Sequence, residues 1–166
     1  GEWNRPSTKT RAGCGSRSGT RLYGRPGAKR TSSRTIRARR AGTAPMYCTG
    51  AGKAILANLP RAQIEEYLET TSLERYTDTT ITEKDRLREE LEIIATRGYA
   101  VGNAEHDELI RSVAAPVWSH EGRVIASLSA LGLVTRFPEE RVHDVSQRIT
   151  VTAVELSRQM GHQSRR

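Results

Sequence analysis

The chain has 166 residues, with 27 Lys and Arg against 19 Asp and Glu, and a formal net charge of +8 at pH 7. It has no apolar run near the roughly 18 residues that a membrane span needs, and its two cysteines are no disulfide framework and have no metal-ligand spacing. We therefore expect a cytoplasmic protein that uses no membrane, metal or cofactor.

The positive charge belongs to the first quarter of the chain. Residues 1–43 hold twelve of the basic residues and one acid, Glu2, whereas residues 44–166 hold 15 basic and 18 acidic residues. Residues 1–43 are rich in Gly, Arg, Ser and Thr without apolar periodicity, so we expect disorder. Their composition also suggests translation in a wrong frame, which is a hypothesis. If the segment is genuine, non-specific, salt-sensitive binding to nucleic acid stays open as an alternative function.

Residues 44–162 are predicted to form one compact domain, and residues 163–166 a frayed end. Two short helices are expected at 53–57 and 61–69, followed by an irregular Thr-rich stretch. The clearest helix begins at Thr82, where Thr82-x-x-Asp85 fits a capping box, and ends at Gly98. The last helix starts after Pro138 and has an apolar stripe at steps of three and four residues: Val142, Val145, Ile149, Ala153, Leu156 and Met160.

Two strands are predicted between these helices, over residues 110–118 and 123–133. They flank the polar loop Ser119-His120-Glu121-Gly122, which suits a hairpin. If Trp118 pairs with Arg123, Ser112 lies directly opposite Ser129. One face of the sheet would then carry small and hydroxyl side chains at its centre, as in a ligand pocket, although serines are also ordinary on a solvent-facing strand.

Gly50-Ala51-Gly52-Lys53 is a glycine-rich turn that leads into a helix. It is not a Walker A motif, because Tyr47 and Ala54 stand where Gly and Ser or Thr are required. Free backbone N–H groups at such a turn suit a small anion, for example a carboxylate. A purely structural tight turn is the other interpretation.

Cys48 and His106 would be the nucleophile and base if the protein were an enzyme, but no third group is identifiable. A lone Cys near a strand is more often a small buried hydrophobe. The run Glu105-His106-Asp107-Glu108 resembles a metal cluster, yet consecutive side chains point in different directions, so we expect a solvated turn. We assign no catalytic residue and no metal ligand, and keep an enzyme on a GAF-like fold that uses Cys48 as an alternative.

Six segments, in this order, resemble the C-terminal effector-binding domain of the IclR family of bacterial transcription regulators. They are Met46–Ala57, Tyr76–Thr77 with Thr80–Thr82, Arg97–Val101, Glu105–His106, Arg111–Val117 and Gly122–Val124. The resemblance covers about residues 44–162. It implies an α+β, GAF-like domain, with a curved, largely antiparallel sheet and packed helices, which binds a small carboxylic acid and forms a homodimer or tetramer. Residues 1–43 do not resemble the winged helix-turn-helix through which the family binds DNA.

The resemblance also implies which residues contact the effector. The backbone amides of Ala51 and Gly52 would hold the ligand carboxylate. Side chains at Ile110, Ser112 and Ser129 would line the pocket, with Leu131 at the place of a second family serine. Gly102-Asn103 stands where the family often has an acidic pair. We therefore expect either an effector more apolar than a short keto acid or a degraded site, and no catalysis.

Overall fold

The structure, a computed structural model, describes residues 20–21 and 43–163. Its elements in chain order are β1 (Thr20–Arg21), β2 (Thr43–Ala44), α1 (Gly50–Leu56), α2 (Arg61–Thr70), α3 (Lys84–Arg97), β3 (Ala100–Asn103), β4 (Ile110–Trp118), β5 (Val124–Leu133), a 3₁₀ turn (Glu139–Arg141) and α4 (Val142–Gln159). The α+β class is confirmed. The strand β3, which shows no clear alternation in sequence, was not predicted.

The main sheet is antiparallel and has the order β3-β4-β5. Both predicted strands are confirmed within one residue at each end, but their predicted register is wrong by two positions. Ser112 lies opposite Leu131, Ala114 opposite Ser129 and Pro116 opposite Ser127. The register shifts between Val117 and Trp118, so a bulge next to the turn displaces the pairing that the loop alone suggested.

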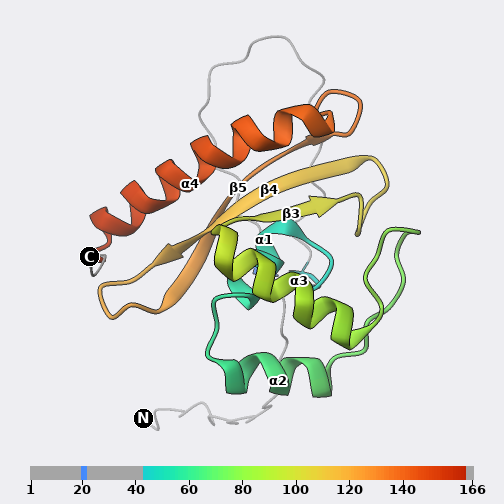
Figure 1. Cartoon of the computed structure of the whole chain (residues 1–166), viewed down its shortest axis with the longest axis horizontal. Helices are drawn as coiled ribbons and strands as arrows, with labels where there is room; N and C mark the ends of the chain where they lie inside the picture. Colours follow the sequence, from blue (N-terminus) through green and yellow to red (C-terminus); the bar gives the residue numbers. More distant parts are fainter. Residues whose placement is uncertain (1–19, 22–42, 164–166) are drawn as a thin grey trace, which may run out of the picture.

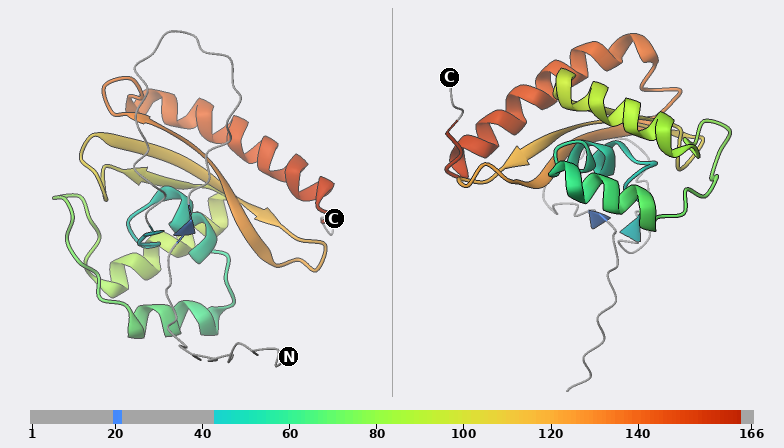
Figure 2. Two further views of the ribbon diagram at one scale, coloured as in Figure 1. Left: turned by 180° about the vertical axis from the view of Figure 1, so that it is seen from behind. Right: turned by 60° about the horizontal axis from the view of Figure 1, so that its bottom comes forward.

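The sheet separates two layers of helices. Helix α4 covers one face, whereas α1, α2 and α3 lie on the other side (Figures 1 and 2). Because side chains alternate along a strand, Ala115 and Val117 of β4 pack with Ala153 of α4, while Ala100 of β3 and Ala114 of β4 join the opposite core. The small alanines on both faces let the helices approach the sheet closely.

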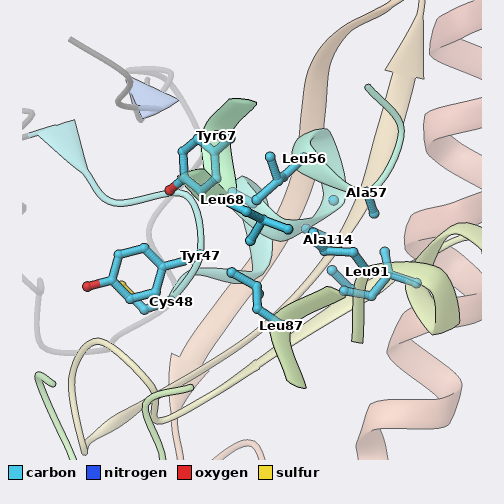
Figure 3. Close-up of a cluster of buried hydrophobic side chains, with 13 residues drawn as sticks. Tyr47, Cys48, Leu56, Ala57, Tyr67, Leu68, Leu87, Leu91 and Ala114 are labelled. Atoms are coloured by element: carbon cyan, nitrogen blue, oxygen red, sulfur yellow. The ribbon is translucent and has the colours of Figure 1, made fainter. Parts of the chain in front are cut away.

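The larger core lies between the sheet and helices α1 to α3. Figure 3 shows its centre, where Leu56, Leu68, Leu87 and Leu91 from three different helices converge. Each of these leucines is at most 2% exposed. Side chains buried this completely contribute roughly 1.5–3 kcal/mol each, so this core holds α2 and α3 against α1.

The ends of α3 test the predicted helix signals. Gly98 ends the helix at φ 81°, in the left-handed conformation that favours glycine, as predicted. The predicted capping box is wrong. The N-cap is Glu83, not Thr82, and no side chain caps the helix there, while the Thr82 hydroxyl accepts a weak hydrogen bond from Arg75.

Helix α4 confirms the first four positions of the predicted stripe, which are half-buried at Val142, Val145 and Ile149 and buried at Ala153, but not the last two. Its fully buried positions are Ser146, Ala153 and Ser157, whereas Leu156 and Met160 of the predicted stripe are exposed. Ser157 is buried because its hydroxyl accepts the Trp118 N–H at 2.9 Å and donates to the Ala153 carbonyl at 2.7 Å. A polar contact to the sheet at Ser157 therefore accompanies the apolar contacts of α4.

The basic N-terminal segment is described at few positions. Thr20–Arg21 pair with Thr43–Ala44 as a two-residue antiparallel ladder, so Thr20, Arg21 and Thr43 are strand within the segment 1–43, which was expected to be disordered. The prediction for residues 1–19 and 22–42, and for the end at 164–166, lies outside the described residues. Of the helices that the structure describes, none has the length and apolar character to cross a membrane.

Candidate functional site

The glycine-rich turn forms the first turn of α1. Thr49 is its N-cap, and the Thr49 side chain accepts the Gly52 N–H at 3.1 Å. That amide is therefore already used inside the protein, contrary to the role expected for Gly52. The N–H groups of Gly50 and Ala51 have no acceptor within the described part of the chain, as is usual for a helix start. Ala51 thus keeps a free donor, although its residue is only 6% exposed.

Helix α1 touches the sheet at one unusually close point. A Cβ placed on Gly50 would lie 2.6 Å from Ser112 Oγ, and one on Gly102 would lie 2.6 Å from the same oxygen and 2.7 Å from the Gly50 nitrogen. Three small residues from α1, β3 and β4 therefore meet there. The structure places the Ser112 hydroxyl directly beside the start of α1.

The other expected pocket residues lie on the same face of the sheet as Ser112. Ile110 is two residues before it in β4, Leu131 is its direct partner in β5, and Ser129 is the diagonal neighbour. Ser129 and Ile110 are half-buried, and Leu131 is 55% exposed. Neither serine hydroxyl makes a hydrogen bond among the described residues. The predicted register is wrong by two residues, but the same side chains still share this face, because side chains alternate with period two.

Cys48 does not have the environment of a nucleophile. Its side chain is buried in the main core, 1% exposed, and its Sγ contacts the Pro45 carbonyl at 3.8 Å. Burial, and next the nearby Glu105 carboxylate, raise the pKa of the Cys48 thiol to about 12. A nucleophilic cysteine requires a lowered pKa, so this thiol is inert at neutral pH. The His106 ring is placed instead against Tyr76, with ring centres 4.8 Å apart.

The run of polar residues predicted a solvated turn, and this prediction is wrong for Glu105. It is 6% exposed, and its Oε1 accepts a hydrogen bond from Lys53 Nζ at 2.7 Å. The Asn103 N–H donates to the same oxygen at 3.1 Å. Lys53 is itself buried and lies 3.6 Å from Glu90 Oε1. This buried pair links α1 to the loop after β3, and its partners are 52 positions apart, so no local pattern in the sequence marks it.

The Lys53–Glu105 pair lies at the base of an open groove of about 730 Å³. The groove is lined by the loop between α2 and α3, by α3, and by parts of β3, β4 and the start of α4. None of the six residues predicted to contact the effector lines it. Sequence reasoning therefore missed this feature entirely.

The described residues contain no group of three or more His, Cys, Asp or Glu side chains arranged to hold a metal ion. Asp107 and Glu108 are exposed, and the Asp107 carboxylate accepts the Leu109 N–H at 2.9 Å, which closes the turn before β4. The acidic run is thus divided between a buried ion pair and a surface turn.

Known proteins resemble this chain in both sequence and structure. The family model described as bacterial transcriptional regulator IclR C-terminal matches residues 28–158. The regulator KipR of Bacillus subtilis is 31% identical over 118 residues, which are 71% of this chain and 47% of that protein. KdgR of Escherichia coli is 36% identical over 118 residues, 71% of this chain and 45% of that protein. The chain thus spans less than half the length of these relatives.

Two solved structures are informative neighbours. The crystal structure of Thermotoga maritima IclR aligns with a TM-score of 0.73 at 36% identity, over 79% of this chain and 53% of that one. The inducer-binding domain of PobR from Acinetobacter, a double mutant in complex with 3-hydroxybenzoic acid, aligns with a TM-score of 0.69 at 28% identity. That alignment covers 74% of this chain and 73% of that one, and it confirms the fold expected from the resemblance.

Proposed function

The chain belongs to the IclR family of bacterial transcription regulators, and from this membership we propose that its domain senses a small carboxylic acid in the cytoplasm. It contains an effector-binding domain of that family. The relatives named above are transcriptional regulators. The buried, protonated Cys48 gives no support to the alternative of a cysteine enzyme. Control of transcription by the whole protein is part of the proposal.

The unpaired donors beside the start of α1 support the choice of an acid. Ala51 offers a backbone N–H without an acceptor in the described part of the chain, and Ser112 and Ser129 offer hydroxyl groups without partners there. A carboxylate accepts hydrogen bonds only, so it matches a set made of donors. The Gly52 amide takes part indirectly, because its bond to Thr49 fixes the turn that presents the Ala51 N–H.

The surrounding side chains favour an acid with an apolar body. Leu131 lies opposite Ser112 and is more than half exposed, and Ile110 lies next to it on the same face. At Gly102, where the family often has an acid, this chain has no side chain at all. An aromatic or branched monocarboxylate fits this face better than a short keto acid. The neighbouring PobR domain, whose structure contains 3-hydroxybenzoic acid, supports a ligand of this kind.

Calorimetry with a panel of monocarboxylates tests the site. For an acid that binds the full 166-residue chain, Ser112→Ala and Ser129→Ala should each raise Kd about tenfold, because a hydrogen bond to a charged group contributes about 1.5–3 kcal/mol. Ser127→Ala is the matched control, since Ser127 lies on the same strand and face but opposite Pro116. Unchanged affinity in both test variants would disprove the site.

We also propose that the chain forms a homodimer or tetramer and that α4 takes part in the contact. Its surface away from the sheet carries Val151 and Val154, which are 70% and 58% exposed. The two valines are neighbours at i and i+3 on the helix, and adjacent exposed apolar side chains are common at subunit contacts. Light scattering coupled to gel filtration should show an oligomer that Val151→Glu with Val154→Glu dissociates. A monomeric wild-type chain would overturn this part of the proposal.

A further inference from the structure

The groove above the Lys53–Glu105 pair carries equal numbers of positive and negative side chains. Its cationic lining residues are Lys53, Arg75, Arg86, Arg97 and Arg111. Its acidic lining residues are Asp78, Glu83, Glu90, Glu105 and Glu139. A ligand with a single negative charge would be repelled by as many side chains as attract it, and so would a ligand with a single positive charge. A ligand that carries both charges avoids this conflict.

The base of the groove has one acceptor that nothing in the described part of the chain satisfies. The Glu105 Oε2 atom is buried and has no hydrogen-bond partner there, whereas Oε1 accepts from both Lys53 and Asn103. A buried carboxylate oxygen without a donor is costly, so such an atom calls for a hydrogen-bond donor from a ligand or a water. An ammonium or hydroxyl group supplies that donor.

Positive groups that line the same groove are available for the opposite end of a ligand. Lys53 Nζ has three N–H donors and one hydrogen bond, to Glu105, because its 3.6 Å contact with Glu90 is too long to count as one. Arg86 on α3 is exposed and makes no ion pair among the described residues. The ligand carboxylate can therefore bind to a cation without displacing an internal ion pair.

We propose that this groove is a second small-molecule site that binds a zwitterion of the α-amino acid class. The ammonium group of the ligand donates to Glu105 Oε2, and its carboxylate accepts from Arg86 and the free donors of Lys53. The volume of about 730 Å³ is within the range of small-molecule sites, and the mainly polar walls suit a hydrophilic ligand. The groove is lined by Val101 and Asn103 of β3, and neither Ser112 nor Ser129 is among its lining residues.

Thermal melting of the full chain with each of the common amino acids tests the proposal. A compound that binds the native state raises the melting temperature by mass action. We expect a shift with at least one amino acid that persists in Ser112→Ala, and none with methylammonium, which carries the positive charge alone. No shift with any amino acid, or an equal shift with methylammonium alone, would overturn the proposal.

Variants then locate the site by calorimetry with the amino acid that gives the largest shift. Glu105→Gln should weaken binding about tenfold, and Arg86→Ala several-fold, because each removes one charged hydrogen bond to the ligand. Arg86→Ala keeps the test valid if Glu105→Gln fails to fold, since Arg86 is exposed. Arg136→Ala is the control, because Arg136 is an exposed arginine outside the groove.

The two proposed sites can be tested independently of each other. Ser112→Ala and Ser129→Ala should leave amino acid binding unchanged, and Arg86→Ala should leave binding of a monocarboxylate unchanged. Loss of amino acid binding in the serine variants would place that ligand at the face beside α1 and overturn the second site. Equal affinity of wild type, Glu105→Gln and Arg86→Ala would overturn it as well.

Discussion

Replacing Gly50 with alanine should destabilise the domain by moving α1 away from the sheet. The new Cβ would lie 2.6 Å from Ser112 Oγ and 3.1 Å from the Gly102 nitrogen, both closer than ordinary contact. Overpacking of this kind costs about 1–3 kcal/mol, and the gain from removing a helical glycine offsets at most about 1 kcal/mol. We expect a net loss of about 1–2 kcal/mol, seen as a melting temperature lower by several degrees.

A double-mutant cycle tests whether Ser112 Oγ is the atom that clashes with the new Cβ at position 50. With Ser112→Ala the nearest remaining atoms are the Gly102 nitrogen at 3.1 Å and the residue 112 Cβ at 3.5 Å, so the double variant should recover part of the loss. Urea unfolding should give a coupling free energy of at least about 0.5 kcal/mol between the two changes. Gly132→Ala is the control, because its Cβ would meet Phe137 at an ordinary 3.5 Å. A neutral Gly50→Ala variant, or strictly additive effects, would refute the close approach of α1 to Ser112.

Three further outcomes follow from other contacts. Arg88 donates to both carboxylate oxygens of Glu65, at 3.2 and 2.9 Å, and lowers the pKa of Glu65, so Glu65→Gln should lower the melting temperature at neutral pH. This difference should vanish in about 1 M salt and as the pH falls through the range where Glu65 becomes protonated, and a salt-independent difference would contradict it. In a Cys14→Ser background, Cys48 should react with iodoacetamide at pH 8 only in urea, and rapid labelling of the native chain would show that its thiol is exposed. Ser157→Ala should reduce the free energy of unfolding by about 1–3 kcal/mol, because a backbone N–H of β4 loses its acceptor, and unchanged urea unfolding would argue against this contact.

Sequence patterns predicted those elements whose signals are local. The strand at 110–118 is a strand-like run next to a polar turn, the strand at 124–133 alternates in sequence, and the C-terminal end of α3 is marked by a glycine with positive φ. Strand β3 has four residues, Ala100–Asn103, one of them a glycine. Such a strand exists because β4 pairs with it, which no window along the sequence can reveal.

Long-range polar contacts explain most of what could not be predicted. The Lys53–Glu105 pair joins residues 52 positions apart, and the Ser157–Trp118 bond joins residues 39 positions apart. Each contact buries polar side chains that would be expected on the surface if burial were judged from apolar residues alone. The second contact buries Ser157 on α4, whereas the neighbouring Leu156 is exposed. Both residues of the first contact line the groove, and their distance in sequence explains why composition and motifs gave no sign of it.

Ser112 and Ser129 were predicted to share one face of the sheet, and they do so although the predicted register is wrong. A shift of two residues changes the neighbour of every side chain but not the face on which it lies, whereas a shift of one would have reversed the faces. Ser112 and Ser129 therefore stay on the face toward α1, although Leu131 and not Ser129 is the direct partner of Ser112. The correction alters the chemistry expected of the ligand: the direct pair is one hydroxyl and one apolar side chain, so this face presents a polar contact beside an apolar one. This pairing favours an acid with an apolar body over one with a second polar group.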